Sequence, residues 1–471
     1  VNVALLAIPQ GMAYAAIAEL PILYGIICSA VASIVAPLFA SSRQTILGPT
    51  NATSLMVFSF FAAQGLAMEE KLALMPLLVL MVGIICLIGA LLKTADLLQY
   101  ISQSVLVGYI TGAAMLIMMN QGKHLFGVAD TVQSASNFFG MLDSLLAVSS
   151  SFLWQPALLG GATLLIYFAI SRFLPTLPNF ALTLFLVALG SAIAANFLPG
   201  WSETVPNFKA YALNDLQPKF PTPSENGIFN DISTLMSVAL AIAFLASLEN
   251  TVMSKSIASR TGQRAEINQD MLSVGMANIA CAFTAAMPAS GSLTRSALNY
   301  ESKARTGVAS LLCGFFCLIA VFAFAFMAPN PVSFVPKTAL AALVVAVAAS
   351  LIKWKNIRIC LLSTPDDAVV LVITFVTALI APLYVAIFFG VALSIFLFLR
   401  KVSKPHLVEY EISDEGELRE LDNKKARPIP AISIVHVEGA LFFGASELFR
   451  TQIQRLVVDP NLKVIILRLK N

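Results

Sequence analysis

Residues 48–54 read Gly-Pro-Thr-Asn-Ala-Thr-Ser, residues 288–296 read Pro-Ala-Ser-Gly-Ser-Leu-Thr-Arg-Ser, and both stretches interrupt long apolar runs. In each, Pro and Gly break the run, and hydroxyl and amide side chains then begin a new helix. A helix N-terminus presents unpaired N–H groups and about +0.5 of a charge, which suits an anion. Arg295 adds a full positive charge beside the second stretch. Two interrupted segments in corresponding halves of a membrane protein predict a transporter's binding site, here for an anion.

Composition places the chain among polytopic membrane proteins. Of its 471 residues, 58% are hydrophobic and only 12% are charged, whereas a soluble domain carries about a quarter charged residues. The six cysteines lie in or beside apolar runs, which is typical of small buried side chains and not of disulfides or metal ligands. We expect no cofactor and no metal.

Apolar runs of about 20 residues can cross the hydrocarbon core as helices, and their pattern predicts an all-α membrane protein with fourteen transmembrane helices. The predicted spans are 1–16, 22–40, 50–66, 72–93, 102–121, 152–171, 179–197, 232–256, 270–286, 290–300, 306–328, 335–352, 367–382 and 383–401. We expect the first helix to be truncated, because Val1 opens in the middle of an apolar segment. The third and tenth spans are the short ones, seven positions apart. This spacing predicts 7+7 inverted repeats.

Loop charges support this layout independently. If the N-terminus is cytoplasmic, fourteen Lys and Arg residues lie on the cytoplasmic side and five on the outer side. The outer five are Lys71, Lys123, Lys209, Lys219 and Lys337. This asymmetry agrees with the positive-inside rule.

The chain changes character after its last predicted span. We expect a transmembrane domain over 1–401, a charged linker over 402–430 and the first part of a soluble domain over 431–471. In that last region, 432–437 alternates like a strand, 439–456 is predicted helical and 463–469 is predicted to be a second strand. Strand–helix–strand order predicts part of a small α/β domain on the cytoplasmic side.

Arg295 and Glu249 are candidate functional residues because they carry charge at membrane depth. Such a side chain costs about 2.5–3.5 kcal/mol to insert, so it indicates function unless it only caps or pairs with a neighbour. For Glu249 that neighbour would be Lys255. Gln10 and Tyr14 stand four residues apart after Pro9 and share one helix face. That face either lines a cavity or bonds to another helix.

Other site types find no support in the sequence. No Gly-x-x-x-x-Gly-Lys-Ser/Thr loop is present for a nucleotide. The three histidines form no metal-ligand cluster, and no basic and aromatic interleaving suggests nucleic acid. A nucleophile–base pair at membrane depth is also missing, so we do not expect an enzyme.

Several motifs together resemble the sulfate permease (SulP, solute carrier 26) family, and they occur in the same order over essentially the whole chain. They are Ile8–Ala15 (Ile-Pro-Gln-Gly-Met-Ala-Tyr-Ala), Leu20–Gly25 (Leu-Pro-Ile-Leu-Tyr-Gly), Ser42–Gln44, Gly48–Thr50, Asn268–Asp270, Gly275–Ile279 and Gly291–Ala297. The C-terminal part resembles the start of the family's cytoplasmic STAS domain.

The resemblance implies a fold of core and gate domains, dimeric assembly and a substrate site between the N-termini of the third and tenth helices. By the resemblance, the substrate-binding residues are Gln10, Tyr14, Ala52, Thr53, Ser292, Thr294 and Arg295. Thr294 stands where many members have Ser. Glu249 stands where plant-type sulfate symporters carry a carboxylate linked to proton coupling. Sodium-coupled bicarbonate members tend to have Asp there and a different first-helix motif, which favours sulfate and protons here.

A charge count connects Glu249 to coupling. Two helix ends at about +0.5 each and Arg295 together give roughly +2. An ionised Glu249 lowers this to about +1, whereas a protonated one leaves a site matched to a divalent anion. The hypothesis is that protonation of Glu249 favours sulfate binding.

The sequence is also compatible with other kinds of anion transport. The same site could serve a sodium-coupled bicarbonate transporter or a chloride/bicarbonate exchanger. An uncoupled anion channel or a voltage-responsive motor would use the same scaffold without coupling. We expect a multi-pass protein of the plasma (inner) membrane, with an inorganic anion, a proton or sodium, the bilayer and a second copy of the chain as partners.

Overall fold

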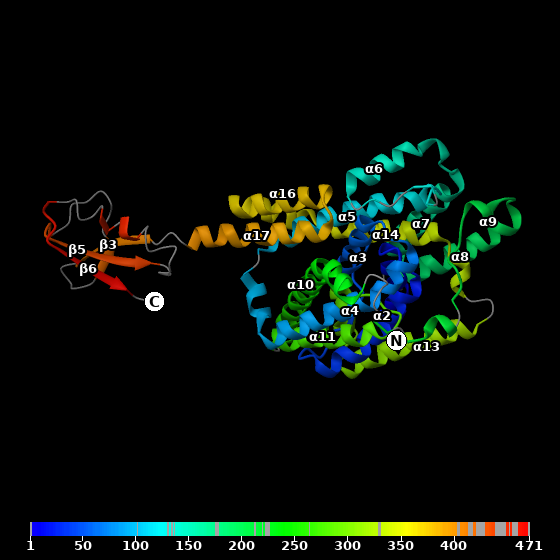
Figure 1. Ribbon diagram of the computed structural model, residues 1–471, viewed down its shortest axis with the longest axis horizontal. Helices are drawn as coiled ribbons and strands as arrows, with labels where there is room; N and C mark the ends of the chain where they lie inside the picture. Colours follow the sequence, from blue (N-terminus) through cyan, green and yellow to red (C-terminus); the bar gives the residue numbers. More distant parts are fainter. Residues whose placement is uncertain are drawn as a thin grey trace. The chain divides into compact units, whose positions relative to one another are not determined.

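The computed structural model describes residues 2–100, 102–129, 131–132, 135, 137–174, 179–211, 213–218, 220–221, 227–262, 264–327, 331–402, 406–412, 418–420, 429–438, 449–451, 453–454 and 460–469. The chain divides into two compact units, Val1–Val391 and Ala392–Asn471. Where the structure describes it, the first unit is helical (Figure 1), and its two short strands are β1 (Leu47–Gly48) and β2 (Ser290–Gly291).

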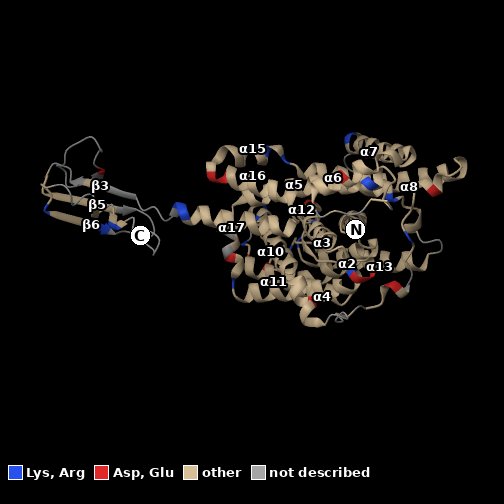
Figure 2. Cartoon of the chain, turned by 45° about the horizontal axis from the view of Figure 1, so that its top comes forward, with Lys and Arg blue, Asp and Glu red and all other residues tan. Residues whose placement is uncertain are grey.

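Nine helices among the described residues are long and apolar enough to cross a membrane. In all, seventeen α-helices are described. They are α1 Asn2–Ile17, α2 Ile22–Phe39, α3 Asn51–Gln64, α4 Met68–Leu91, α5 Gln103–Leu125, α6 Phe138–Ala147, α7 Trp154–Phe173, α8 Asn179–Phe197, α9 Trp201–Thr204, α10 Ile228–Thr261, α11 Ile267–Ala282, α12 Leu293–Glu301, α13 Val308–Phe326, α14 Lys337–Leu351, α15 Trp354–Ser363, α16 Pro365–Ile380 and α17 Leu383–Val402. Short 3₁₀ helices cover Thr94–Tyr100, Ser149–Ser151, Leu213–Leu216 and Pro331–Phe334. Figure 2 shows how few charged residues these helices carry.

Each of the fourteen predicted spans coincides with a helix, and the predicted third and tenth spans are α3 and α12. The count of fourteen membrane crossings stays a prediction. Two further helices of ten residues, α6 and α15, lie between predicted spans. The search for long apolar runs does not detect these two helices, because each is too short to cross the hydrocarbon core alone.

Packing sorts the helices of the first unit into two groups. In the α4 group, α4 packs against α10 and α11, and α2 packs against α1, α11 and α13. In the α5 group, α5 packs against α14 and α16, and α7 packs against α8 and α14. The groups meet where α1 contacts α8 and α14 and where α3 contacts α5. Such a division is what the predicted core and gate domains would require.

Two short strands join the polar stretches that interrupt the apolar runs. Strand β1 (Leu47–Gly48) pairs antiparallel with β2 (Ser290–Gly291), with Leu47 opposite Gly291 and Gly48 opposite Ser290. All four residues are buried. Because α3 and α12 begin directly after these strands, the pairing holds the two helix starts side by side.

The second unit contains a four-stranded sheet in the order β4-β3-β5-β6. Its strands are β3 His406–Ile412, β4 Leu418–Glu420, β5 Ile432–Glu438 and β6 Val464–Leu469. Strand β3 runs antiparallel to β4 and β5, whereas β5 and β6 are parallel, with Ile432 opposite Val464. The two predicted strands therefore exist as β5 and β6. Most of the predicted helix 439–456 lies outside the described residues.

Part of the predicted linker 402–430 forms strands β3 and β4 instead. Val408, Tyr410 and Ile412 alternate with Glu409 and Glu411, and this alternation is the strand signal that the charged composition hid. The assignment of this unit to a STAS domain stays a prediction.

Candidate functional site

The start of α3 is capped by its own hydroxyl groups. The backbone N–H of Thr53 donates to the Thr50 hydroxyl at 3.4 Å, and the Thr50 N–H donates to the Thr53 hydroxyl at 3.2 Å. This reciprocal cap needs a hydroxyl at both positions, which the sequence provides. Thr53, predicted as a substrate residue, is fully buried and holds the helix start. Its neighbour Ala52 is buried, and its carbonyl accepts the Tyr109 hydroxyl at 3.4 Å.

The start of α12 is built in a similar way. Ser292 is the N-cap, and its hydroxyl accepts the Arg295 N–H at 3.5 Å and lies 3.3 Å from the Thr294 hydroxyl. Ser292 also donates its backbone N–H to the Ile46 carbonyl at 3.2 Å. Thr294 is exposed, whereas Ser292 is buried. The cap and the Ile46 bond fix where α12 begins relative to β1.

Glu249 of α10 joins the two helix starts. The Thr50 hydroxyl donates to Glu249 Oε2 at 2.9 Å, and the Ser290 hydroxyl donates to the same oxygen at 2.7 Å. One carboxylate oxygen thus receives a hydrogen bond from each of the two polar stretches. This places the predicted coupling residue at the junction of α3 and α12.

Arg295 is the largest fully buried side chain of the described residues. Its Nε donates to Gln10 Oε1 at 3.1 Å and its Nη1 donates to the Ser29 hydroxyl at 3.2 Å, while its guanidinium lies 5.8 Å from the centre of the Tyr14 ring. Its Nη2 is buried without a partner in the described part of the chain. A buried guanidinium of this kind needs a negative or polar partner, so the unpaired nitrogen makes Arg295 a candidate ligand-binding residue.

Gly48 makes room for that guanidinium. A Cβ added at Gly48 would overlap Arg295 Nη1, so a side chain cannot stand here without moving the arginine. Gly291 opposite is equally confined, because a Cβ there would lie 2.6 Å from Asn250 Oδ1 and 2.8 Å from Asn250 Cα. The glycines of the paired strands therefore let α10 and Arg295 approach the backbone closely.

A buried amide fixes the chain that leads into β2. Asn278 of α11 donates its Nδ2 to the Ala289 carbonyl at 3.0 Å, and its Oδ1 accepts the Ala289 N–H at 2.8 Å. This pair replaces the hydrogen bonds that a helix would supply to Ala289. The interruption at 288–291 is thus held by α11 from one side and by β1 from the other.

Comparisons with known proteins show the family of the chain. The family model described as the sulfate permease family matches residues 1–374. The chain belongs to the sulfate permease family.

Sequence relatives match most of the chain. The probable sulfate transporter 4.2 of Arabidopsis thaliana is 30% identical over 417 residues, which are 86% of this chain and 59% of that protein. A probable sulfate transporter of Mycobacterium tuberculosis is 28% identical over 466 residues, 98% of this chain and 80% of that protein. The chain therefore spans about three fifths of the length of the plant relative.

Solved structures share the fold. The murine Slc26a9 anion transporter in its inward-facing state superposes with a TM-score of 0.85 at 18% identity, over 99% of this chain and 78% of that one. The transmembrane domain of the cyanobacterial bicarbonate transporter BicA gives 0.67 at 18% identity, over 84% and 94% of the two chains.

In this sulfate permease family member, the structure collects the predicted residues into two neighbouring clusters. Gln10 and Tyr14 contact Arg295, while Ala52, Thr53, Ser292 and Thr294 belong to the two helix starts. Sequence reasoning missed Ser29, Thr50 and Ser290, which bind Arg295 or Glu249 directly. Thr50 and Ser290 lay inside the quoted stretches, so their hydroxyls were available as a signal. Ser29 sits in an apolar run and gave none.

Proposed function

We propose that this chain is a secondary active transporter of inorganic anions, with sulfate as the first candidate and protons as the coupling ion. Its membership of the sulfate permease family and the names of its plant and mycobacterial relatives support the class. The observation that carries the proposal is the pairing of β1 with β2, which brings two helix N-termini and the buried Arg295 together.

The anion would lie between the starts of α3 and α12, near the unpaired Nη2 of Arg295. Unpaired N–H groups of a helix start bind anions without any further side chain, and Arg295 strengthens the positive potential there. Ser292 and Thr294 would add hydroxyl donors. Gln10 and Tyr14 would close the site from α1, because both already contact the arginine.

Glu249 supports coupling to a proton. Its Oε2 accepts hydrogen bonds from both helix starts, so its charge acts on the place where the anion would bind. The ionised carboxylate reduces a site charge of roughly +2 to about +1. A divalent anion would therefore bind best when Glu249 is protonated.

Movement of the α4 group against the α5 group would expose the site to each side of the membrane in turn. The division of the helices into two groups supports this alternating access. We further propose that the chain forms a dimer, as the family resemblance implies, and that it lies in the plasma (inner) membrane.

Uptake of labelled sulfate into liposomes that contain the purified chain tests the proposal. We expect uptake to be stimulated by an acid-outside pH gradient and to persist when bicarbonate is added. If no sulfate enters under any gradient, or if bicarbonate abolishes uptake, the proposal is wrong. Bicarbonate transport is the second candidate, because BicA is described as a bicarbonate transporter and shares the fold.

Glu249→Gln tests the coupling. The amide fixes the site in its uncharged form, so we expect sulfate uptake to lose its dependence on pH while binding remains. The matched control is Glu203→Gln, because Glu203 lies exposed on α9. Unchanged pH dependence in the Glu249 variant would sink the coupling hypothesis and leave sulfate transport standing.

A further inference from the structure

A cavity with charged residues in its wall lies apart from the two helix starts. It has a volume of about 720 Å³ and lies among the C-terminal ends of α1 and α5, the first residues of α2, α4 and α14, and residues 208–211 and 214–215. None of the residues proposed above for the central anion site lines it. The cavity therefore needs its own explanation.

Basic residues gather at this cavity. Lys123, Lys209 and Lys337 line it, against the two carboxylates Glu19 and Asp215. These three lysines are among the only five basic residues that the loop-charge count assigns to the outer side. The predicted outer side has few basic residues, and three of them line this one cavity. This concentration of positive charge favours binding of an anion over a cation.

Gln121 supplies a buried donor at the cavity wall. The residue lines the cavity and is only 2% exposed, and its Nε2 has no partner among the described residues. A buried amide N–H₂ without an acceptor is costly, so it indicates a ligand that accepts hydrogen bonds. The first turn of α2 adds to this, because it begins at the cavity after Pro21 without a side-chain cap.

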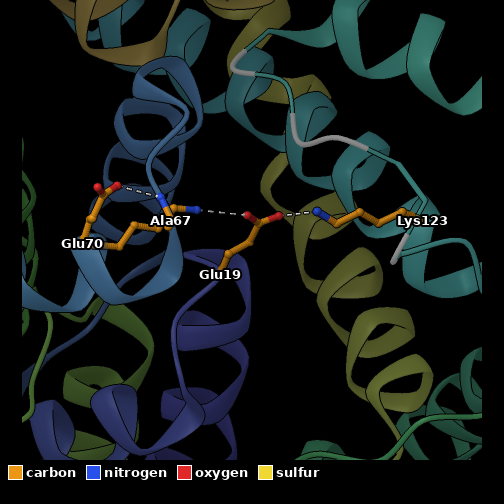
Figure 3. Close-up of polar contacts among 5 residues, drawn as sticks. Glu19, Ala67, Glu70 and Lys123 are labelled. Carbon is orange, nitrogen blue, oxygen red and sulfur yellow. Dashed lines mark hydrogen bonds and ion pairs between the residues drawn. The ribbon is translucent and has the colours of Figure 1, made fainter.

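Glu19 shows how an anion would bind there. Its carboxylate accepts a hydrogen bond from Lys123 (Figure 3). The same carboxylate lies 3.8 Å from Lys71 Nζ. The residue sits in the turn after α1 with φ of 54°, a left-handed conformation that is uncommon for a residue with a side chain. The fold therefore holds a carboxylate of its own in contact with the buried Lys123.

We propose that this outer cavity is a second anion site for a small inorganic oxyanion, and that Glu19 is its built-in competitor. Gln121 and Lys123 would donate hydrogen bonds to the anion, and Lys209 and Lys337 would attract it electrostatically. An entering anion would take the place of the Glu19 carboxylate on Lys123. The class of anion rests on the proposed function, but binding at this cavity does not require transport.

Calorimetric titration of the purified full chain with sodium sulfate, at pH 8 and constant ionic strength, tests the proposal. Glu19→Gln removes the competitor, so we expect sulfate to bind the outer cavity several-fold more tightly. Gln121→Leu removes one donor, so we expect binding about two- to tenfold weaker, the effect of one hydrogen bond. Glu203→Gln and Asn196→Leu are the matched controls and should not change binding, because both residues are exposed and neither lines the cavity.

Tighter sulfate binding by Glu19→Gln together with weaker binding by Gln121→Leu supports the site, because loss of folding would weaken binding in both variants. Lys209→Glu gives a further check that does not disturb the interior, since Lys209 is exposed. It should weaken binding. The proposal is wrong if all three variants bind sulfate with the same affinity as the controls. It is also wrong if neither the wild type nor Glu19→Gln binds sulfate. Variant-sensitive binding without any sulfate uptake would overturn only the proposed transport function.

Discussion

Arg295 concentrates the chemistry of this protein in one side chain. It is fully buried, it contacts α1 and α2 through Gln10 and Ser29, and one of its nitrogens is left without a partner in the described residues. A cation in such a place is costly unless anionic or polar groups surround it. In the proposed transporter, the substrate itself completes this surrounding.

Replacement of Arg295 should therefore remove transport more than it removes folding. For Arg295→Gln we expect sulfate uptake to fall by about thirtyfold or more, because loss of one member of a buried charged pair costs ~2–5 kcal/mol. Arg295→Lys keeps the charge but not the planar group, so it should recover only part of the activity. Initial uptake rates into proteoliposomes, normalised to reconstituted protein, measure both. Full activity of Arg295→Gln would contradict the central site.

The side chains that sequence reasoning identified at this scale are those with an unusual charge in an apolar run, Arg295 and Glu249. Their partners could not be predicted in the same way. Thr50 meets Glu249 across 199 residues of chain, and Ser29 meets Arg295 across 266. Serine and threonine are common in membrane helices, and only the tertiary fold decides which of them turns toward a charge.

At the level of elements, the fold depends on how two interrupted segments pair. Pro and Gly predicted where α3 and α12 begin, because these residues break an apolar helix by a local rule. The pairing of β1 with β2 involves two residues on each side, which is too short for an alternating pattern to be recognised. The sequence thus predicts where the two apolar helices are interrupted, but it does not predict that the two interruptions pair with each other.

Gly48 in β1 leaves no room for a side chain. Gly48→Ala places a methyl group where Arg295 Nη1 lies, so either β1 or the arginine must move. We expect sulfate uptake to fall by about tenfold or more, which corresponds to roughly 1.4 kcal/mol. Gly161→Ala on α7 is the matched control, because a Cβ there meets nothing within 4 Å and alanine favours a helix. Equal uptake by the two variants would show that the Gly48–Arg295 contact has no role in transport.

At the scale of the whole molecule, apolar runs located the helices, while their grouping needed the structure. Each predicted span lies on a helix, yet nothing in a single apolar run tells that α4 packs against α11 or that α5 packs against α14 and α16. Small and apolar residues are spread over all these helices, so several pairings satisfy the same pattern. The orientation of the chain in the membrane, in contrast, can be predicted from the charges of its loops.

The loop charges predict that the cavity lined by Lys209 faces outward and that α15, which carries Lys355, faces the cytoplasm. Both residues are exposed, and the six native cysteines are buried, so a single introduced cysteine can be labelled selectively. In intact cells, a membrane-impermeant maleimide should label Lys209→Cys and not Lys355→Cys. After permeabilisation it should label both. Labelling of Lys355→Cys alone in intact cells would reverse the orientation, and the cavity around Gln121 would then face the cytoplasmic anion pool.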